Sequence, residues 1–249
     1  MSEKLFNWYR FAGPQAFYPL AGRMIPWFWA LAAIFGIAGL YVGFLVAPTD
    51  AQQGEGYRII FLHVPASWMS MFIYLVMAFW AGLGLAFNFR LSGMMAQALA
   101  PTGAMFAFLS LWTGALWGKP MWGAWWVWDA RLTSELILLF LYVGFIALQS
   151  AIDDPRRADK AGAILALVGV VNVPIIYFSV KWWNTLHQGS SVNLTKSSMA
   201  TTMLWGMLLC ALACWMYAIA VALMRVRRII LERERDTAWV RETLARQTS

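Results

Sequence analysis

Charged residues are scarce in this chain. Asp, Glu, Lys and Arg together make up 12% of its 249 residues, whereas 61% are hydrophobic. A water-soluble domain normally contains about 25% charged and about 45–50% apolar residues. The composition therefore excludes an ordinary soluble enzyme, and the abundance of apolar residues excludes a disordered chain.

Cysteine and nucleotide-binding motifs are also scarce. The chain has two cysteines, Cys210 and Cys214, which lie four residues apart in an apolar segment and are most simply small packing residues on one helix face. It has no Cys-x-x-Cys sequence, so disulfide exchange and covalent haem attachment within the chain are unsupported. It also lacks a Gly-x-x-x-x-Gly-Lys-Ser/Thr loop, so any ATP hydrolysis must come from a partner.

Long apolar segments fill most of the sequence instead. Each is long enough to cross a bilayer as a helix, the form that satisfies its own backbone groups in lipid. The sequence therefore predicts an all-α polytopic membrane protein, built as one membrane domain over residues 1–249. Proline inside the segments, as at Pro101 and Pro174, is expected to be tolerated as a kink. The six predicted spans are 25–47, 64–89, 98–118, 133–152, 161–180 and 199–224.

The distribution of Lys and Arg predicts the orientation of these spans. Fourteen of these residues fall on the side that carries both termini, and five fall on the other side. By the positive-inside rule, both termini are cytoplasmic. We expect an interfacial N-terminal segment at 1–23 and a charged tail at 225–249, which is a solvated extension or a docking site for an ATPase. The outer loops are 48–63, 118–132 and 181–198.

No predicted span carries a charge near its middle. The nearest case is Glu135, close to an outer end. A proton- or ion-coupled pump normally has ionisable groups at membrane depth. A pump of that kind is therefore disfavoured.

The only two histidines, His63 and His187, both fall on the predicted outer side. A single histidine there is most simply a solvated loop residue, but two on one side and none elsewhere favour a shared role.

Tryptophan is concentrated on the same side. If the second outer loop is read as a helix, four of its residues share one face; alternatively, the loop dips into the lipid headgroups. These residues are Trp122, Trp125, Trp126 and Asp129.

Histidines beside a flat aromatic face favour haem as the ligand. Neutral imidazole is a good axial ligand for its iron, and indoles pack well against the macrocycle. The anionic propionates would then lie against Arg131 first, with Arg58, Lys119 and Lys181 as other candidates. Arg131 could instead pair with Glu135 four residues later. Asp129 could cap the fourth span or orient a group beside the haem.

The segment 122–133, Trp-Gly-Ala-Trp-Trp-Val-Trp-Asp-Ala-Arg-Leu-Thr, resembles the tryptophan-rich WWD signature of haem-handling proteins in cytochrome c biogenesis. With its six spans, and with His-Val-Pro-Ala-Ser-Trp-Met at His63 and Leu-His-Gln-Gly-Ser at His187, the chain resembles the cytochrome c maturation protein C (heme exporter protein C) family. The resemblance covers nearly the whole chain. It implies a multi-pass protein of the bacterial inner membrane that presents non-covalently bound haem b on its periplasmic side.

The resemblance also implies roles for residues and partners. His63 and His187 match the family's axial ligands to haem iron. The loop that matches the family's haem- and chaperone-contacting region contains Trp122, Trp125, Trp126, Trp128 and Asp129. The implied partners are the periplasmic haem chaperone, cytochrome c maturation protein E, which receives the haem, the ABC transporter subunits A and B, and the small single-span protein D. No catalytic residue is implied.

Two other functions are compatible with the sequence. One is a haem permease, with the tryptophan loop as an outer gate. The other is an electron-transferring b-type cytochrome, which typically needs histidines inside its spans, often as two pairs. A single pair of histidines on the outer side provides no second haem site for electron transfer across the bilayer.

Overall fold

The computed structural model describes residues 13–183 and 199–248, and within them every regular element is a helix. Helices are expected for segments surrounded by lipid, because each helix satisfies its own backbone hydrogen bonds. In chain order the elements are α1 (Pro14–Tyr41), the π-helical η2 (Val42–Val46), the 3-10 helix η3 (Glu55–Ile59), α2 (Ile60–Phe87), α3 (Arg90–Trp122), α4 (Ala130–Ala151), α5 (Pro155–Gly169), α6 (Asn172–Trp182), α7 (Thr201–Arg233) and α8 (Ala238–Thr248).

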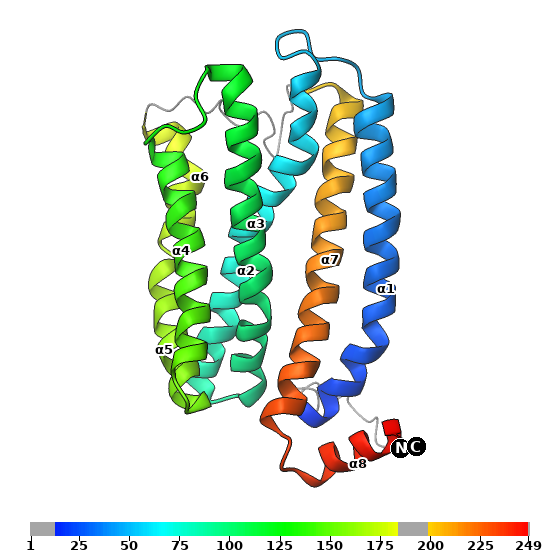
Figure 1. Cartoon of the computed structure of the whole chain (residues 1–249), viewed down its shortest axis with the longest axis vertical. Helices are drawn as coiled ribbons and strands as arrows, with labels where there is room; N and C mark the ends of the chain where they lie inside the picture. The colour runs from blue at the N-terminus through cyan, green and yellow to red at the C-terminus, as the bar shows by residue number, and fades with distance from the viewer. Residues whose placement is uncertain (1–12, 184–198, 249) are drawn as a thin grey trace, which may run out of the picture.

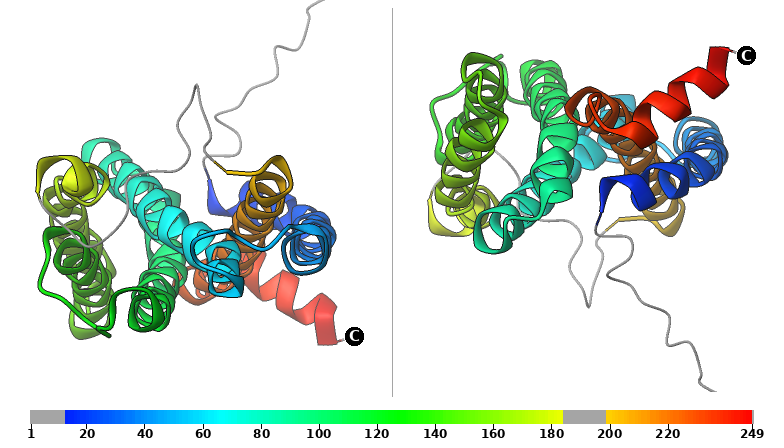
Figure 2. Two further views of the ribbon diagram at one scale, coloured as in Figure 1. Left: turned by 90° about the horizontal axis from the view of Figure 1, so that it is seen from above. Right: turned by 90° about the horizontal axis from the view of Figure 1, so that it is seen from below.

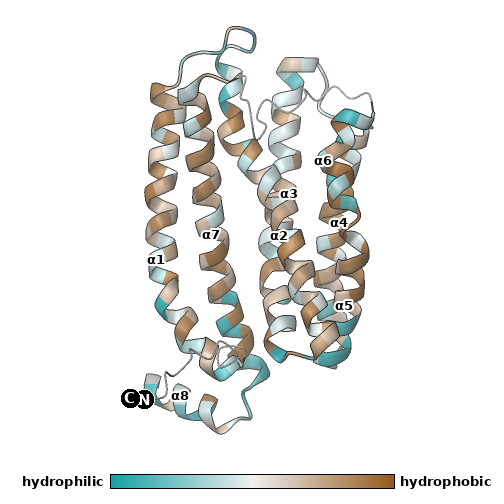
Figure 3. Ribbon diagram, turned by 180° about the vertical axis from the view of Figure 1, so that it is seen from behind, coloured by the Kyte–Doolittle hydropathy of each residue, from teal (hydrophilic) through white to brown (hydrophobic). Residues whose placement is uncertain are grey.

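Six stretches of helix in this part of the chain are long and apolar enough to cross a membrane, as predicted. Three of them combine two elements each: α1 with η2, η3 with α2, and α5 with α6. Apolar residues dominate the middle of the bundle, and hydrophilic ones gather toward its two ends (Figure 3). The last span is longer than predicted, because α7 continues through Arg225 to Arg233.

The helices form two groups joined by α2 and by the packing of α3 against α7 (Figures 1 and 2). On one side α1 packs against α7, and on the other α4 packs against α3, α5 and α6. Helix α2 crosses the bundle obliquely and contacts α3, α5 and α7. In the most apolar stretch of the first span, α1 with η2, only 11% of the residues are buried. In the corresponding stretch of α3, 61% are buried. Helix α1 is therefore a peripheral helix whose apolar residues face lipid, and α3 is central.

Small residues allow α1 and α7 to approach closely, as is common between membrane helices. A Cβ atom on Gly39 would lie 2.8 Å from both the backbone nitrogen and the sulfur of Cys210. Cys210 is buried there, Cys214 is partly buried, and both thiols are free of disulfides. The two cysteines are therefore packing residues, as the sequence predicts.

The fifth span is broken rather than merely kinked. Helix α5 ends at Gly169 and α6 begins at Asn172, so Pro174 lies in the first turn of a new helix, where its missing N–H costs least. The Asn172 side chain donates to the carbonyl of Ser134, 2.9 Å away. A Cβ atom on Gly169 would overlap the hydroxyl of Tyr74. The hydrogen bond from Asn172 to Ser134 therefore holds the start of α6 against α4.

The connections divide between the two ends of the bundle. The turn between η2 and η3 and the segment that joins α3 to α4 lie at one end, which we call the loop end (Figure 1). The start of α1, the α2–α3 and α4–α5 turns and helix α8 lie at the other, which we call the α8 end. The predicted outer tryptophan loop is at the loop end.

Candidate functional site

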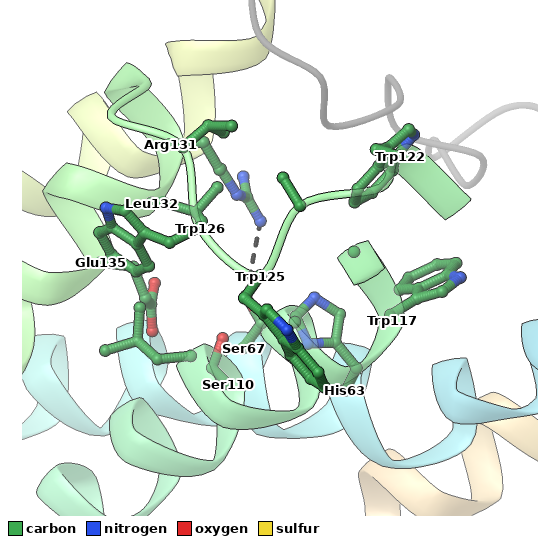
Figure 4. A pocket seen from close by; sticks show the side chains of 15 residues that line it. His63, Ser67, Ser110, Trp117, Trp122, Trp125, Trp126, Arg131, Leu132 and Glu135 are labelled. Atoms are coloured by element: carbon green, nitrogen blue, oxygen red, sulfur yellow. Dashed lines mark hydrogen bonds between the residues drawn. The ribbon is translucent and has the colours of Figure 1, made fainter. Parts of the chain in front are cut away.

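A pocket, partly open to the outside, lies at the loop end. Helices α2, α3 and α4 form its floor and walls, and the segment between α3 and α4 covers it. Figure 4 shows His63 and Arg131 pointing into the space, with Trp125 beside His63. The lining side chains that carry polar or aromatic groups are His63, Ser67, Ser110, Trp117, Trp122, Trp125, Trp126, Arg131 and Glu135.

His63 is held in one orientation by α3. It lies in the first turns of α2, is 7% exposed, and its Nδ1 atom is 3.0 Å from the hydroxyl of Thr113. Its ring meets the indole of Trp117 edge to face at 5.6 Å. A Cβ atom on Gly114 would come within 3.1 Å of the ring, so glycine provides the room that the imidazole needs.

The hydrogen bonds of Thr113 assign the tautomer of His63. The threonine hydroxyl donates its one proton to the carbonyl of Leu109, 2.5 Å away. It must therefore accept from His63, which makes Nδ1 the protonated nitrogen. Nε2 is then the unprotonated nitrogen, whose lone pair can accept a hydrogen bond or bind a metal. An N–H donated to a fixed oxygen is the usual support for a metal-binding imidazole.

Tryptophans form an apolar wall beside this imidazole. Trp117 is 3% exposed, and its indole N–H donates to the side-chain oxygen of Gln53, 2.9 Å away in the loop before η3. The Trp122 ring lies 6.2 Å from the Trp117 ring. On the opposite side, the indole nitrogen of Trp126 is buried with no hydrogen-bond partner in the described part of the protein. This wall suits a flat apolar ligand that also offers a hydrogen-bond acceptor to the indole N–H of Trp126.

The tryptophan loop is not a helix, contrary to the one-face interpretation. Helix α3 ends at Trp122 because Gly123 adopts a left-handed conformation (φ 76°) and donates to the carbonyl of Lys119. Glycine reaches this conformation without the strain of a Cβ atom. Asp129 then begins α4, and its carboxylate accepts from the backbone N–H of Leu132 at 2.8 Å. The predicted capping role of Asp129 is thus confirmed.

Arg131 and Glu135 occupy the α4 side of the pocket. The guanidinium of Arg131 donates to the carbonyl of Ile176 at 3.0 Å and to the hydroxyl of Ser67 at 3.4 Å (Figure 4). Glu135 accepts from the hydroxyl of Ser70 at 2.7 Å through one oxygen, and its other oxygen is buried without a partner in the described residues. No ion pair within 4 Å joins these two charged side chains, which both belong to the described region. The alternative of a direct Arg131–Glu135 ion pair is therefore not formed.

Comparison with known proteins agrees with this architecture. The family model of heme exporter protein C matches residues 7–241. Heme exporter protein C of Escherichia coli K12 is 47% identical over 244 residues, which cover 96% of this chain and 97% of that protein. The chain belongs to the heme exporter protein C family. Another member, from Bradyrhizobium diazoefficiens, is 48% identical over 224 residues, with 89% and 84% of the two chains covered.

Another relative is named for the process in which it takes part. A cytochrome c biosynthesis ccmC-like mitochondrial protein of Marchantia polymorpha is 47% identical over 181 residues, covering 73% of this chain and 75% of that protein. With six apolar helices and membership of the heme exporter protein C family, the chain is a multi-pass protein of the bacterial inner membrane.

The structure brings together five of the residues that the sequence singled out. His63, Trp122, Trp125, Trp126 and Arg131 all line the one pocket. Two others lie away from its lining: Trp128, which is 78% exposed and packs edge to face on Trp126 at 5.3 Å, and Asp129, the helix cap. The second histidine, His187, lies outside the described residues.

The other basic candidates on this end have partners elsewhere. Arg58 donates to the carbonyls of Gly43 and Ala47, at 2.5 and 3.2 Å. Lys119 donates to the carbonyl of Gly123 at 3.1 Å, and the amino group of Lys181 lies 5.8 Å from the centre of the Phe178 ring. Of these candidates for an anionic group, only Arg131 lines the pocket.

Sequence reasoning counted Trp117 among the outer tryptophans but missed the two serines and the glycine that line the pocket with it and carry a periodic signal. Ser67 is four residues after His63 and lies one turn further along the same face of α2. Ser110, Gly114 and Trp117 follow the same i, i+4, i+7 spacing on α3. With His63 as the starting point, this spacing could have identified Ser67 as a neighbour.

Proposed function

We propose that this protein binds haem in the pocket at the loop end and passes it to the periplasmic haem chaperone, cytochrome c maturation protein E, during cytochrome c biogenesis. One observation carries the proposal: the pocket combines an oriented imidazole, an indole wall and a guanidinium. The names of the relatives, which refer to haem export and cytochrome c biosynthesis, support the same ligand.

Each part of the pocket suits a different part of haem b. The Nε2 lone pair of His63 would ligate the iron, and the Thr113 hydroxyl would keep the ring in the ligating tautomer. The indoles of Trp117, Trp122 and Trp125 would pack against the macrocycle. Arg131 would face a propionate, and the buried Trp126 N–H would find its acceptor in the ligand.

Glu135 limits how the ligand can lie. Its unpartnered oxygen belongs to the α4 side of the pocket, where a carboxylate would repel a propionate. Arg131 lies one helical turn nearer the loop end and would attract it. We therefore place the propionates toward Arg131 and the outside, and the apolar edge of the macrocycle toward the interior.

His187 is proposed as the second axial ligand, from the family motif around it. Two imidazoles would hold the iron firmly, so delivery requires that one of them gives way to the incoming ligand of the chaperone. Trp128, exposed on the segment between α3 and α4, is available for contact with the chaperone. We also propose that the loop end is periplasmic and that both termini are cytoplasmic, following the positive-inside rule.

The proposed assembly includes the ABC transporter subunits A and B and the single-span protein D. ATP hydrolysis would be supplied by that pair, since the chain lacks a phosphate-binding loop of its own. The charged α8 end, which the proposed orientation makes cytoplasmic, is where an ATPase subunit could contact this protein.

Haem titration of the purified protein tests the ligand assignment. His63→Ala and His187→Ala are each expected to lower the haem content and shift the Soret band, and added imidazole should restore part of the spectrum of either variant. An unchanged spectrum in both variants would contradict the assignment.

A second experiment separates delivery from transport. Protein in sealed vesicles, given haem and the purified chaperone outside, should yield a covalent haem–chaperone adduct without net movement of haem into the lumen. Haem accumulation in the lumen with no need for the chaperone would support the permease instead.

A further inference from the structure

A second, larger cavity lies at the α8 end, opposite the haem pocket. It has a volume of about 740 Å³ and is open to the outside. The α2–α3 turn, the start of α5 and the end of α7 meet there, at the end of the bundle seen from below in Figure 2. Its lining includes four cationic side chains and two carboxylates.

Both carboxylates are already paired with a cation of the same lining. Arg233 contacts the two oxygens of Asp159 at 2.6 and 2.9 Å, and Arg90 contacts Glu234 at 2.7 Å. The remaining two cations, Arg156 and Lys160, are exposed, and neither has a carboxylate within 4 Å in the described part of the chain. The cavity therefore has a net charge of two positive units.

These two cations lie on one face of α5. They are four residues apart, so their side chains are one turn apart on the same side of the helix. Two helices also begin at the cavity, α3 at Arg90 and α5 at Pro155. The positive end of the α3 dipole adds to the charge of the side chains, whereas the start of α5 is already capped by the carboxylate of Asp154. A singly or doubly charged anion fits this environment.

One edge of the cavity is apolar and exposed. Leu85 and Phe89 belong to the lining, and Phe89 stacks on Phe87 with ring centres 5.5 Å apart. The exposed fractions of these two phenylalanines are 44% and 61%. Because they lie at the end of a membrane span, an apolar chain can follow this edge into the bilayer.

We propose that this cavity binds the headgroup of an anionic phospholipid. Arg156 and Lys160 contact the phosphate, and the acyl chains pass over Leu85, Phe87 and Phe89. A basic pocket between helix ends is a typical site for such a headgroup. Free phosphate shares the charged part of this chemistry, but it makes no use of the apolar edge.

The test uses the full-length purified protein in detergent with phosphatidylglycerol, and native mass spectrometry to count the bound lipid. Arg156→Gln with Lys160→Gln should weaken binding by roughly 25-fold, about five-fold for each cation removed. Arg157→Gln is the matched control, since Arg157 is exposed on the same turn but is not part of the lining. It should leave phosphatidylglycerol affinity within about two-fold of the wild type.

Further ligands distinguish the sources of the anion. Phosphatidylcholine should bind weakly to every variant, and inorganic phosphate alone should not raise the melting temperature. An equal loss in the Arg157→Gln control, or equal binding of the two lipids, would overturn the proposal. So would stabilisation by inorganic phosphate that matches that of the lipid. Both substituted side chains are exposed, so neither substitution is expected to disturb folding. An unchanged melting temperature in phosphatidylcholine checks this for each variant.

Discussion

Replacing Thr113 with valine tests how the proposed haem ligand is oriented without touching the ligand itself. Valine keeps the shape of threonine but removes the hydroxyl that accepts the His63 Nδ1–H at 3.0 Å. The imidazole then loses the contact that fixes both its tautomer and its angle. Loss of such a contact behind a metal ligand typically lowers affinity 10–100-fold, which corresponds to about 1.4–2.8 kcal/mol. We expect a loss of this size in haem titrations followed at the Soret band.

Two companion variants make the result interpretable. Thr113→Ser keeps the hydroxyl, so its haem affinity should stay within a few-fold of that of the wild type, whereas His63→Ala should lose more than Thr113→Val. A serine variant as weak as the valine variant would show that packing, not the hydrogen bond, is responsible. Wild-type affinity and an unshifted Soret band in Thr113→Val would refute the tautomer assignment.

Three other substitutions probe the wall, the cap and the helix packing. Trp125→Leu should weaken haem binding about five-fold, for a loss of about 1 kcal/mol, whereas Trp128→Leu, outside the pocket lining, should leave titrations unchanged. Asp129→Ala should cost about 1 kcal/mol of stability by removing the cap of α4, and Asp129→Asn should retain that stability. A loss of chaperone adduct in the stable Asn variant would reveal a second role for the carboxylate. Gly103→Ala should destabilise the protein by about 1–3 kcal/mol, because the added methyl overlaps the Tyr142 ring, and an unchanged melting temperature would contradict this packing.

Much of the fold follows from hydrophobic length alone. A segment of about 20 apolar residues has few alternatives to a membrane helix, so the six spans could be predicted without tertiary information. The cap at Asp129 could also be predicted, because that role depends on local sequence. The break before Asn172 could not be located, since proline in a membrane span is compatible with either a kink or a new helix.

The pocket required knowledge that the sequence does not carry. Helix α3 is apolar on most of its circumference, so no polar face marks the side on which Ser110 and Thr113 lie. The spacing of the tryptophans between 122 and 129 is compatible with a helix, but the left-handed Gly123 ends α3 and the residues after it are irregular. Even so, Trp125 and Trp126 of the loop line the pocket together with Trp122 at the end of α3, because the loop folds back over the helix ends.

The construction of the pocket suggests how binding and release could be separated in the proposed function. Its floor consists of helices: His63 and Thr113 are held by backbone on α2 and α3, and their geometry is fixed by tertiary packing. Its cover is the irregular segment that carries Trp125 and Trp126, which is attached only at the ends of α3 and α4. Substitutions in the floor should therefore change the equilibrium affinity for haem. Substitutions in the cover should act more strongly on the rate of adduct formation with the chaperone. Stopped-flow transfer from haem-loaded Trp126→Phe, compared with Thr113→Val at equal loading, measures this difference directly, and equal transfer rates in the two variants would show that floor and cover act as one unit.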